Sequence, residues 1–139
     1  MDHIASIRIL PNSKSVFPTE PDFKAYVEKT MIDRDGRYYF PDNMMRCPNG
    51  SLVLFQYDGK IRAYGVLIDK SKEPIQDEHG VTYAGYYKFD VTSLHYLRIP
   101  IDKEKMIEAN PDFKSFNQSK QIIPIECLDK IKSMIDEYS

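Results

Sequence analysis

The 139-residue chain has no tryptophan, only two cysteines and three histidines, and its six glycines are scattered. Two cysteines, Cys47 and Cys127, are too few for a secreted domain held by disulfides, so we expect reduced thiols and a cytoplasmic location. No histidine has ligand spacing to another histidine or a cysteine, so we expect no bound metal. Phosphate-binding glycine loops and the Gly-x-Ser-x-Gly turn are also missing, and we expect no cofactor.

Long apolar runs and a strong net charge are missing as well. No stretch of about 18 apolar residues is present, so we expect no membrane-spanning helix, and the N-terminus lacks the pattern of a signal peptide. The formal net charge of −2 excludes a generic cationic nucleic-acid binder, so any such contact needs a local basic patch and a shaped pocket. The length and a hydrophobic fraction of 42% predict one folded domain over residues 1–139.

Aromatic residues are abundant, with ten tyrosines and seven phenylalanines. Tyrosine suits half-exposed strand positions, because its ring is apolar and its hydroxyl needs a partner. The same residues suit a pocket that stacks on a flat ligand. Composition leaves both interpretations open.

Short apolar segments separated by Pro, Gly, Asn and Asp predict the secondary structure. We expect helices at 20–31 (capped by Thr19), at 102–109 and from residue 124, and strands at 4–10, 37–40, 51–57, 61–68, 81–91, 94–101 and 122–123. Asp58-Gly59 predicts a tight hairpin, and the strand before it is apolar on both faces, which indicates burial on both sides. The predicted fold is α+β: a small, mostly antiparallel, curved β-barrel flanked by short α-helices.

Catalytic patterns are weak. Cys47 and His95 are a thiol and an imidazole, but nothing else in the sequence supports the geometry of a nucleophilic pair. The adjacent acids Asp77 and Glu78 lie in a polar loop and are expected to be solvated. We therefore expect a binding domain with no catalytic residues of its own.

One segment resembles a known group. Residues 39–57, Tyr-Phe-Pro-Asp-Asn-Met-Met-Arg-Cys-Pro-Asn-Gly-Ser-Leu-Val-Leu-Phe-Gln-Tyr, and their continuation over 61–68 are similar to the PUA-like superfamily, especially its EVE-type domains. That group often has an Asn- and Met-containing approach followed by a Gly-initiated strand that ends in Phe-x-Tyr. The Gln-Ser-Lys-Gln-Ile-Ile-Pro run at 118–124, before a short helix, is also similar.

This resemblance implies a β-barrel whose mouth accepts a modified nucleobase, as in EVE and YTH domains, and a role beside HNH-type nucleases that recognise modified DNA. Aromatic and amide side chains are the types that hold and read an unpaired base, and basic side chains meet phosphates. The predicted base-binding residues are Phe40, Asn43, Tyr57, Tyr64 and Tyr87. The predicted phosphate-binding residues are Arg46, Lys114 and Lys120.

The sequence departs from the group in three places. The pockets of EVE and YTH domains usually contain tryptophan, so Tyr or Phe must stack on the base in this chain. The chain is slightly acidic, which weakens non-specific binding to DNA. Asn49-Gly50-Ser51 stands where, in the group, an acidic residue often follows the glycine that opens the strand. Gly59-x-x-Arg62 does not reproduce the catalytic pattern of the related ASCH hydrolases, so hydrolase activity is not transferred.

We therefore expect a reader of modified nucleobases, in DNA rather than RNA, that serves as the specificity domain of a restriction or defence system. Its partners are nucleic acid and a nuclease domain or subunit, and no membrane is involved. Two alternatives stay open: an enzyme that acts on a nucleoside or modified base through the same cleft, and a protein-interaction domain with tyrosine-rich strands as its contact surface.

Overall fold

The Asp58-Gly59 turn joins the two strands at the centre of the structure, a computed structural model that describes residues 3–116 and 121–139. Strands β3 (Leu52–Tyr57) and β4 (Lys60–Ser71) pair antiparallel, and both turn residues have positive φ, 52° and 72°. Asp and Gly tolerate this left-handed geometry, which matches the twist of the flanking strands. The predicted hairpin is confirmed.

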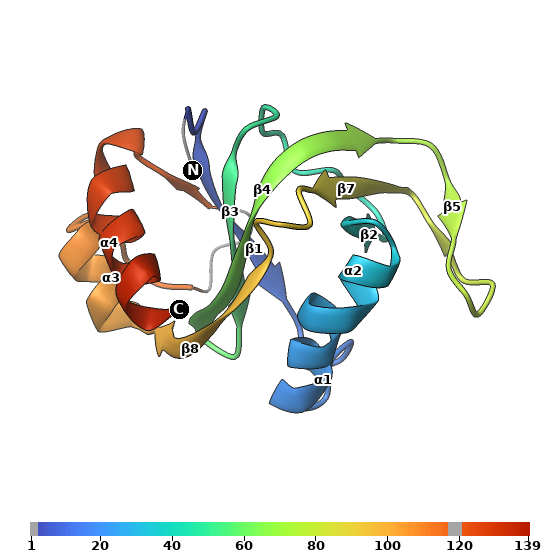
Figure 1. Ribbon diagram of the computed structural model, residues 1–139, viewed down its shortest axis with the longest axis horizontal. Helices are drawn as coiled ribbons and strands as arrows, with labels where there is room; N and C mark the ends of the chain where they lie inside the picture. Colours follow the sequence, from blue (N-terminus) through green and yellow to red (C-terminus); the bar gives the residue numbers. More distant parts are fainter. Residues whose placement is uncertain (1–2, 117–120) are drawn as a thin grey trace.

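The main sheet has the strand order β2-β7-β4-β3-β1-β9, with β8 paired to β4 outside this path. Its remaining strands are β1 (Ile7–Asn12), β2 (Arg37–Phe40), β7 (Gly85–Phe89), β8 (His95–Ile101) and β9 (Ile122–Ile123). β1 runs parallel to β3, so the sheet is mixed. β4 pairs with β8 near its start and with β7 near its end, and register shifts in both pairings mark where it bends (Figure 1).

The sheet is curved, but the prediction of a closed barrel is wrong. Within the described ranges, no backbone ladder joins β2 to β1, although the two strands face each other across an opening that we call the split. Pro11 lies in β1 and Pro41 follows β2 directly. Proline has no N–H to donate, so a continuous ladder cannot form at this place. The α+β prediction itself is confirmed.

Two cores lie on opposite faces of the central strands. All six residues of β3 are buried, as predicted. Val53, Phe55 and Tyr57 enter the inner core, which we define as the cluster beneath the N-terminal helix, β2 and β7. Leu52 and Leu54 enter the outer core, packed beneath the C-terminal helices. The period of two along a strand divides one apolar run between both cores.

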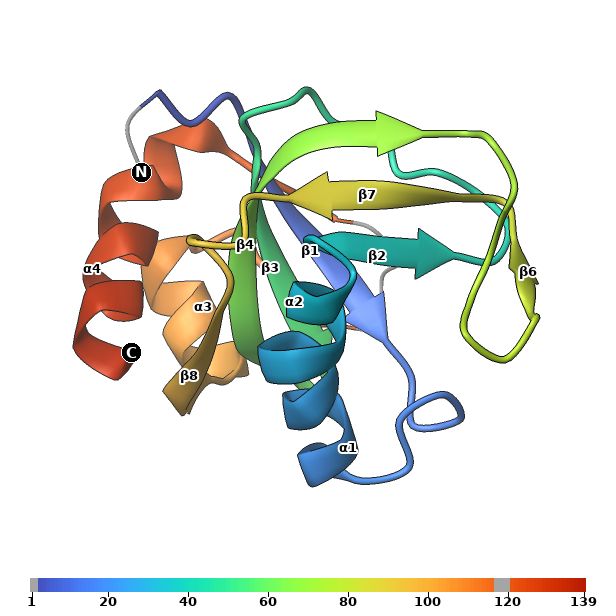
Figure 2. The same ribbon diagram turned by 45° about the vertical axis from the view of Figure 1, so that its right-hand side comes forward.

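Helices cover each core (Figures 1 and 2). α1 (Glu20–Ala25), the π-helical η1 (Tyr26–Thr30) and α2 (Met31–Asp33) form a continuous helix, and Thr19 caps it as predicted. α3 (Lys103–Ala109) is capped by Asp102, and the 3-10 turn η2 (Ile125–Cys127) leads into α4 (Leu128–Tyr138). Within the described part of the chain, none of these helices has the length and apolarity needed to cross a membrane.

A two-stranded hairpin connects the end of β4 to the start of β7 and extends beyond the main sheet (Figures 1 and 2). Its strands, β5 (Ile75–Gln76) and β6 (Thr82–Tyr83), pair only with each other. We call residues 75–83 the arm. Asp77 fixes its tip by accepting hydrogen bonds from the backbone N–H groups of His79 and Val81, at 2.8 and 2.9 Å.

Replacing Phe55 by alanine tests the inner core. Its ring is fully buried between those of Tyr38 and Phe89. We expect Phe55→Ala to lower the free energy of unfolding by about 3–5 kcal/mol, measured by urea denaturation, because the deletion leaves a cavity. Ile68→Ala, at a 45% exposed position of the same hairpin, is the control and should cost less than about 1 kcal/mol. Equal losses for the two variants would contradict the placement of the core.

Candidate functional site

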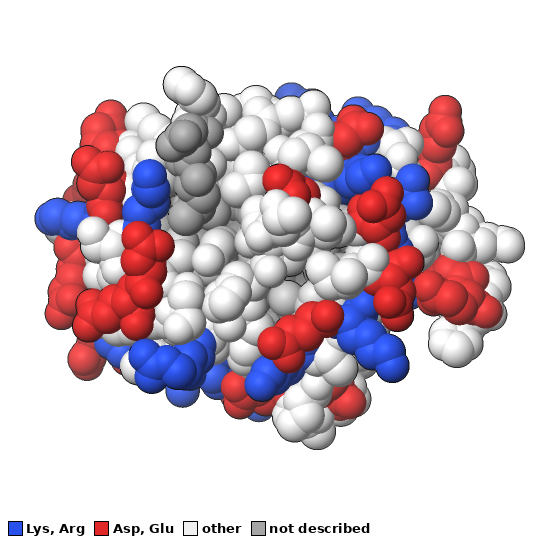
Figure 3. Space-filling model, in the orientation of Figure 1, with Lys and Arg blue, Asp and Glu red and all other residues white. Residues whose placement is uncertain are grey.

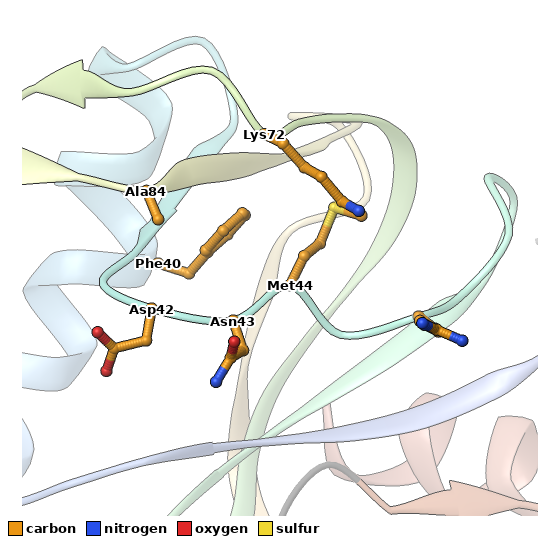
Figure 4. A pocket seen from close by; sticks show the side chains of 7 residues that line it. Phe40, Asp42, Asn43, Met44, Lys72 and Ala84 are labelled. Carbon is orange, nitrogen blue, oxygen red and sulfur yellow. The ribbon is translucent and has the colours of Figure 1, made fainter.

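Two hollows lie in the split between β1 and β2, and a third adjoins them along the segment that follows β2. The aromatic pocket, about 440 Å³, lies where β1 ends. The middle hollow, about 260 Å³, shares Pro11, Tyr38 and Pro41 with it. The outer hollow, about 440 Å³, shares Phe40, Asp42 and Asn43 with the middle one (Figure 4). Together they provide a concave surface of the size that proteins use for small ligands.

A hydrogen bond across the split connects the two unpaired strands. The Tyr38 hydroxyl of β2 donates to Oδ1 of Asn12 in β1 at 2.5 Å. The Asn12 side-chain nitrogen donates to the carbonyl oxygens of Leu10 and Gln56, at 3.1 and 3.2 Å. The Asn12 side chain is only 8% exposed, and all three of these hydrogen bonds satisfy its buried amide. The amide therefore fixes the distance between β1 and β2. Burial raises the pKa of Tyr38, which keeps the hydroxyl protonated as a donor.

Five partly exposed rings surround the aromatic pocket. They come from four segments that are far apart in the sequence: the loop after β1, η1, β2 and the arm. Neighbouring ring centroids lie 4.8–5.7 Å apart for the pairs Phe17 with Tyr26, Tyr26 with Tyr38, and Tyr39 with Tyr83. The rings inside the two cores are fully buried by their neighbours, whereas these five rings keep part of their surface exposed toward the hollow. Such a lining can stack on a flat ligand.

Arg34 is the one charged side chain among the described residues that line the aromatic pocket. Its guanidinium carbon lies 4.3 Å from the ring centroid of Tyr39 and 5.8 Å from that of Tyr26. Its Nε and Nη2 donate to the two carboxylate oxygens of Glu78 in the arm, at 2.9 and 2.7 Å. These bonds lower the pKa of Glu78 to about 2. The pair therefore ties the arm to the pocket with both groups charged at neutral pH.

The backbone of β2 also faces the split. β2 is the end strand of the sheet and pairs only with β7. The Gly36 carbonyl accepts from the Phe89 N–H, and hydrogen-bonded pairs alternate along an antiparallel ladder. Tyr39 is an odd number of residues from Gly36, so its N–H and C=O point away from β7. The Tyr39 N–H donates to the Tyr26 hydroxyl oxygen, so the Tyr39 carbonyl is the main-chain acceptor that this strand offers to the aromatic pocket.

Four of the predicted site residues lie at the split. Phe40 and Asn43 line both the middle and the outer hollow, and Arg46 lines the outer hollow together with Lys72. Tyr87 lies at the back of the middle hollow, 1% exposed, and its hydroxyl accepts the Met45 N–H.

Figure 4 shows how the outer hollow is arranged. The Lys72 and Met44 side chains approach each other across it, while Asp42 and Asn43 point away from Lys72.

The other predicted residues are placed elsewhere. Tyr57 lies in the inner core, 1% exposed, where it stacks on Phe23 at 5.0 Å and donates to the Phe17 carbonyl. Tyr64 packs against the outer core beside His95, because its position on β4 faces the opposite side of the sheet. Lys114 is exposed and lines none of the three hollows, and Lys120 lies outside the described residues.

Sequence reasoning did not select Phe17, Tyr26, Arg34 or Tyr83 as site residues. Tyr26 lies on the apolar face of the first helix and also packs against the inner core, while Arg34 lies in the Asp33-Arg34-Asp35-Gly36 turn. Only the return of the arm brings Tyr83 and Glu78 to that turn. No local pattern signals this long-range contact.

The described ranges hold no group of three or more His, Cys, Asp or Glu side chains arranged to bind a metal ion. Cys47 is buried in the inner core, and this burial raises the pKa of its thiol, so it is a weak nucleophile at neutral pH. The arrangement at the split is suited to binding by stacking and hydrogen bonds.

Tyr38→Phe tests the bond across the split. The change removes one hydroxyl and leaves Asn12 Oδ1 buried without that donor, so we expect the free energy of unfolding to fall by about 1–3 kcal/mol in urea denaturation. Tyr86→Phe is the matched control, since no hydrogen bond of the Tyr86 hydroxyl is found among the described residues, and it should be neutral within about 0.5 kcal/mol. A neutral Tyr38→Phe variant would show that the bond does not hold the strands.

Known structures resemble this chain in fold. The superposition on the ASCH protein from Zymomonas mobilis includes 93% of this chain and 95% of that protein, with 13% identity and a TM-score of 0.56. A single-residue mutant of the same protein superposes with a TM-score of 0.63 and 12% identity. The YTH domain of the Zygosaccharomyces rouxii MRB1 protein, solved in complex with N6-methyladenosine RNA, matches over 97% of this chain and 88% of its own, with 13% identity and a TM-score of 0.50.

No protein-family model and no curated protein matches the sequence. Likeness at 12–13% identity shows the fold alone. The chain shares its fold with the ASCH protein of Zymomonas mobilis and with the YTH domain of the MRB1 protein.

Proposed function

We propose that this protein binds nucleic acid and holds one unpaired, modified nucleobase in the aromatic pocket. The observation that carries the proposal is the set of five partly exposed rings around a hollow that opens beside the free backbone edge of β2. Proteins hold unpaired bases by stacking on aromatic rings and by hydrogen bonds to the base edge. Tyr and Phe rings take the stacking role here, since the chain has no tryptophan.

The edge of the base is read next to Tyr39. The Tyr39 carbonyl accepts from an exocyclic amino group, which keeps one proton after a single methylation. Burial raises the pKa of the Tyr26 hydroxyl, which is therefore neutral and can donate to a ring nitrogen or carbonyl. An acceptor next to a donor matches the Watson–Crick edge of a base, and the added methyl group packs against the rings.

Neighbouring nucleotides occupy the other two hollows. Phe40 and Asn43 line the middle hollow, where a second base can contact a ring and an amide. Arg46 and Lys72 line the outer hollow, and neither takes part in an ion pair with another described residue, so both can meet phosphates.

Local cations matter because the surface as a whole is not basic. On the face in Figure 3, acidic and basic residues are interspersed, and acidic ones gather over α3 and α4. With a net charge of −2, long-range attraction to phosphate is weak, so affinity must come from the pocket and from nearby cations.

The finer form of the proposal concerns the polymer and its context. The YTH neighbour was solved with N6-methyladenosine RNA, while the EVE resemblance points to modified DNA read beside a nuclease domain or subunit. We take modified DNA in a restriction or defence system as the working assignment. The pocket chemistry described above suits a base of either polymer.

Fluorescence anisotropy at fixed salt tests the proposal. The labelled panel contains unmodified cytosine and adenine, 5-methylcytosine, 5-hydroxymethylcytosine and N6-methyladenine, as DNA and RNA, single- and double-stranded. We expect tighter binding to one modified base than to its unmodified parent. Absent binding to every oligonucleotide, in protein shown to be folded, would refute nucleic-acid recognition, and a preference for RNA would move the assignment away from DNA.

Tyr83→Ala removes one ring of the aromatic pocket. We expect the preferred oligonucleotide to lose about 1–3 kcal/mol of binding free energy, roughly 5- to 150-fold in Kd. The matched control is Tyr86→Ala, since Tyr86 packs on Arg37 and lines none of the three hollows. If the two variants bind alike, with unchanged thermal midpoints, the base does not stack in the aromatic pocket.

Arg46→Ala and Lys72→Ala test the phosphate contacts. For a single strand, each lost contact should reduce the slope of log Kd against log salt by about 0.7. Lys103→Ala, on α3 away from the split, is the control and should leave the slope unchanged. Slopes unaltered by all three changes would place the backbone outside the outer hollow.

A further inference from the structure

The ion pair between Arg34 and Glu78 lies at the aromatic pocket, and a second carboxylate of the arm is near it, because Asp77 Oδ2 accepts from the Tyr83 hydroxyl at 3.4 Å. Within the part of the chain that the structure describes, Arg34 is the one charged residue of the lining, and Glu78 reaches it from the arm without lining the hollow itself. The Arg34 side chain is 11% exposed, whereas that of Glu78 is 58% exposed. The pocket therefore contains a nearly buried cation whose direct ion-pair partner, the carboxylate of Glu78, lies outside the lining.

A cationic ligand gains little binding free energy in this pocket. Aromatic cages attract cations through the electron-rich faces of their rings. Here the guanidinium of Arg34 already lies over Tyr39, 4.3 Å from its centroid, and also contacts Tyr26. No carboxylate is found among the described residues of the lining, and that of Asp77 is engaged by the Tyr83 hydroxyl, so a second cation meets Arg34 without a partner of its own.

An anionic ligand gains little as well. Both carboxylate oxygens of Glu78 face Arg34, at 2.7 and 2.9 Å, which satisfies Nε and Nη2 and cancels most of the positive potential. Because that bond lowers the pKa of Glu78 to about 2, the carboxylate stays ionised at neutral pH. An anion that approaches Arg34 meets the charge of Glu78 at the same time.

We propose that Glu78 sets the charge selectivity of the aromatic pocket, so that it accepts an uncharged modified base and rejects cationic and anionic ones. This inference rests on the proposed function and narrows its ligand class. Bases methylated on an exocyclic amine or on carbon fit. Bases that carry a fixed positive charge after ring methylation do not fit, and neither do bases with a carboxylate. Glu78 acts through Arg34 and is a positioning residue.

Two pairs of nucleosides test this in the full chain by isothermal titration at pH 7. N6-methyladenosine and 1-methyladenosine are isomers, of which the second is cationic at this pH. 5-Methylcytidine and 5-carboxycytidine differ in an added negative charge. We expect wild-type protein to prefer the neutral member of the pair it binds, by about tenfold or more, as one charge at close range in partly buried surroundings implies.

Glu78→Gln is the decisive variant. With Arg34 uncompensated, binding of 5-carboxycytidine relative to 5-methylcytidine should rise by about tenfold, and discrimination against 1-methyladenosine should increase by a similar factor. Glu78→Asp, which keeps the charge, should restore most of the wild-type ratio. Glu73→Gln removes an exposed carboxylate that is in no ion pair among the described residues, and it should leave every ratio unchanged.

The outcomes separate the two proposals. A charged nucleoside that binds wild type as tightly as its neutral counterpart, or Glu78→Gln ratios equal to those of Glu73→Gln, would overturn the charge selectivity while base binding stands. If no nucleoside and no oligonucleotide of the earlier panel binds, the proposed function fails, and this inference fails with it.

Discussion

One hydrogen bond sets the spacing of the two strands on which the candidate site is built. Where β1 and β2 would have to pair to close a barrel, the chain has proline on both sides, and the Tyr38 hydroxyl bonded to Asn12 joins the strands instead. A side-chain link holds two strands apart where a ladder would bring them to about 5 Å. The aromatic pocket and the middle hollow lie in this gap between the strands, and the aromatic pocket depends on it most, since Tyr38 is also one of its rings.

The rest of the molecule keeps the split rigid. β3 is buried on both faces, so the sheet is fixed from two sides, by the N-terminal helix over the inner core and by α3 and α4 over the outer core. Aromatic packing continues from Phe55 to Tyr38 and from Phe23 to Tyr57, which connects the core directly to the wall of the pocket. A rigid wall lowers the entropy cost of ordering a bound ligand.

Local patterns in the sequence predicted most elements, because caps, turn dipeptides and apolar periodicity act over a few residues. Thr19, Asp102 and Asp58-Gly59 show this directly. The site was harder to predict. Phe40, Asn43 and Arg46 follow one another along the chain and do line the split, whereas Tyr57 and Tyr64 were chosen by their place on strands, without knowledge of which face each strand presents. The aromatic pocket comes from four distant segments, and the contact of the arm with Arg34 has no local signal.

The same two prolines have a consequence for the behaviour of the protein in solution. An unpaired strand edge is a template on which a second molecule can add its own strand, the first step toward aggregation. β2 is such an edge, and the split exposes another along the end of β1. Pro41 ends β2 after only four residues, and Pro11 interrupts the donors of β1. A sheet that stays open between β1 and β2 is thereby protected from pairing with a copy of itself.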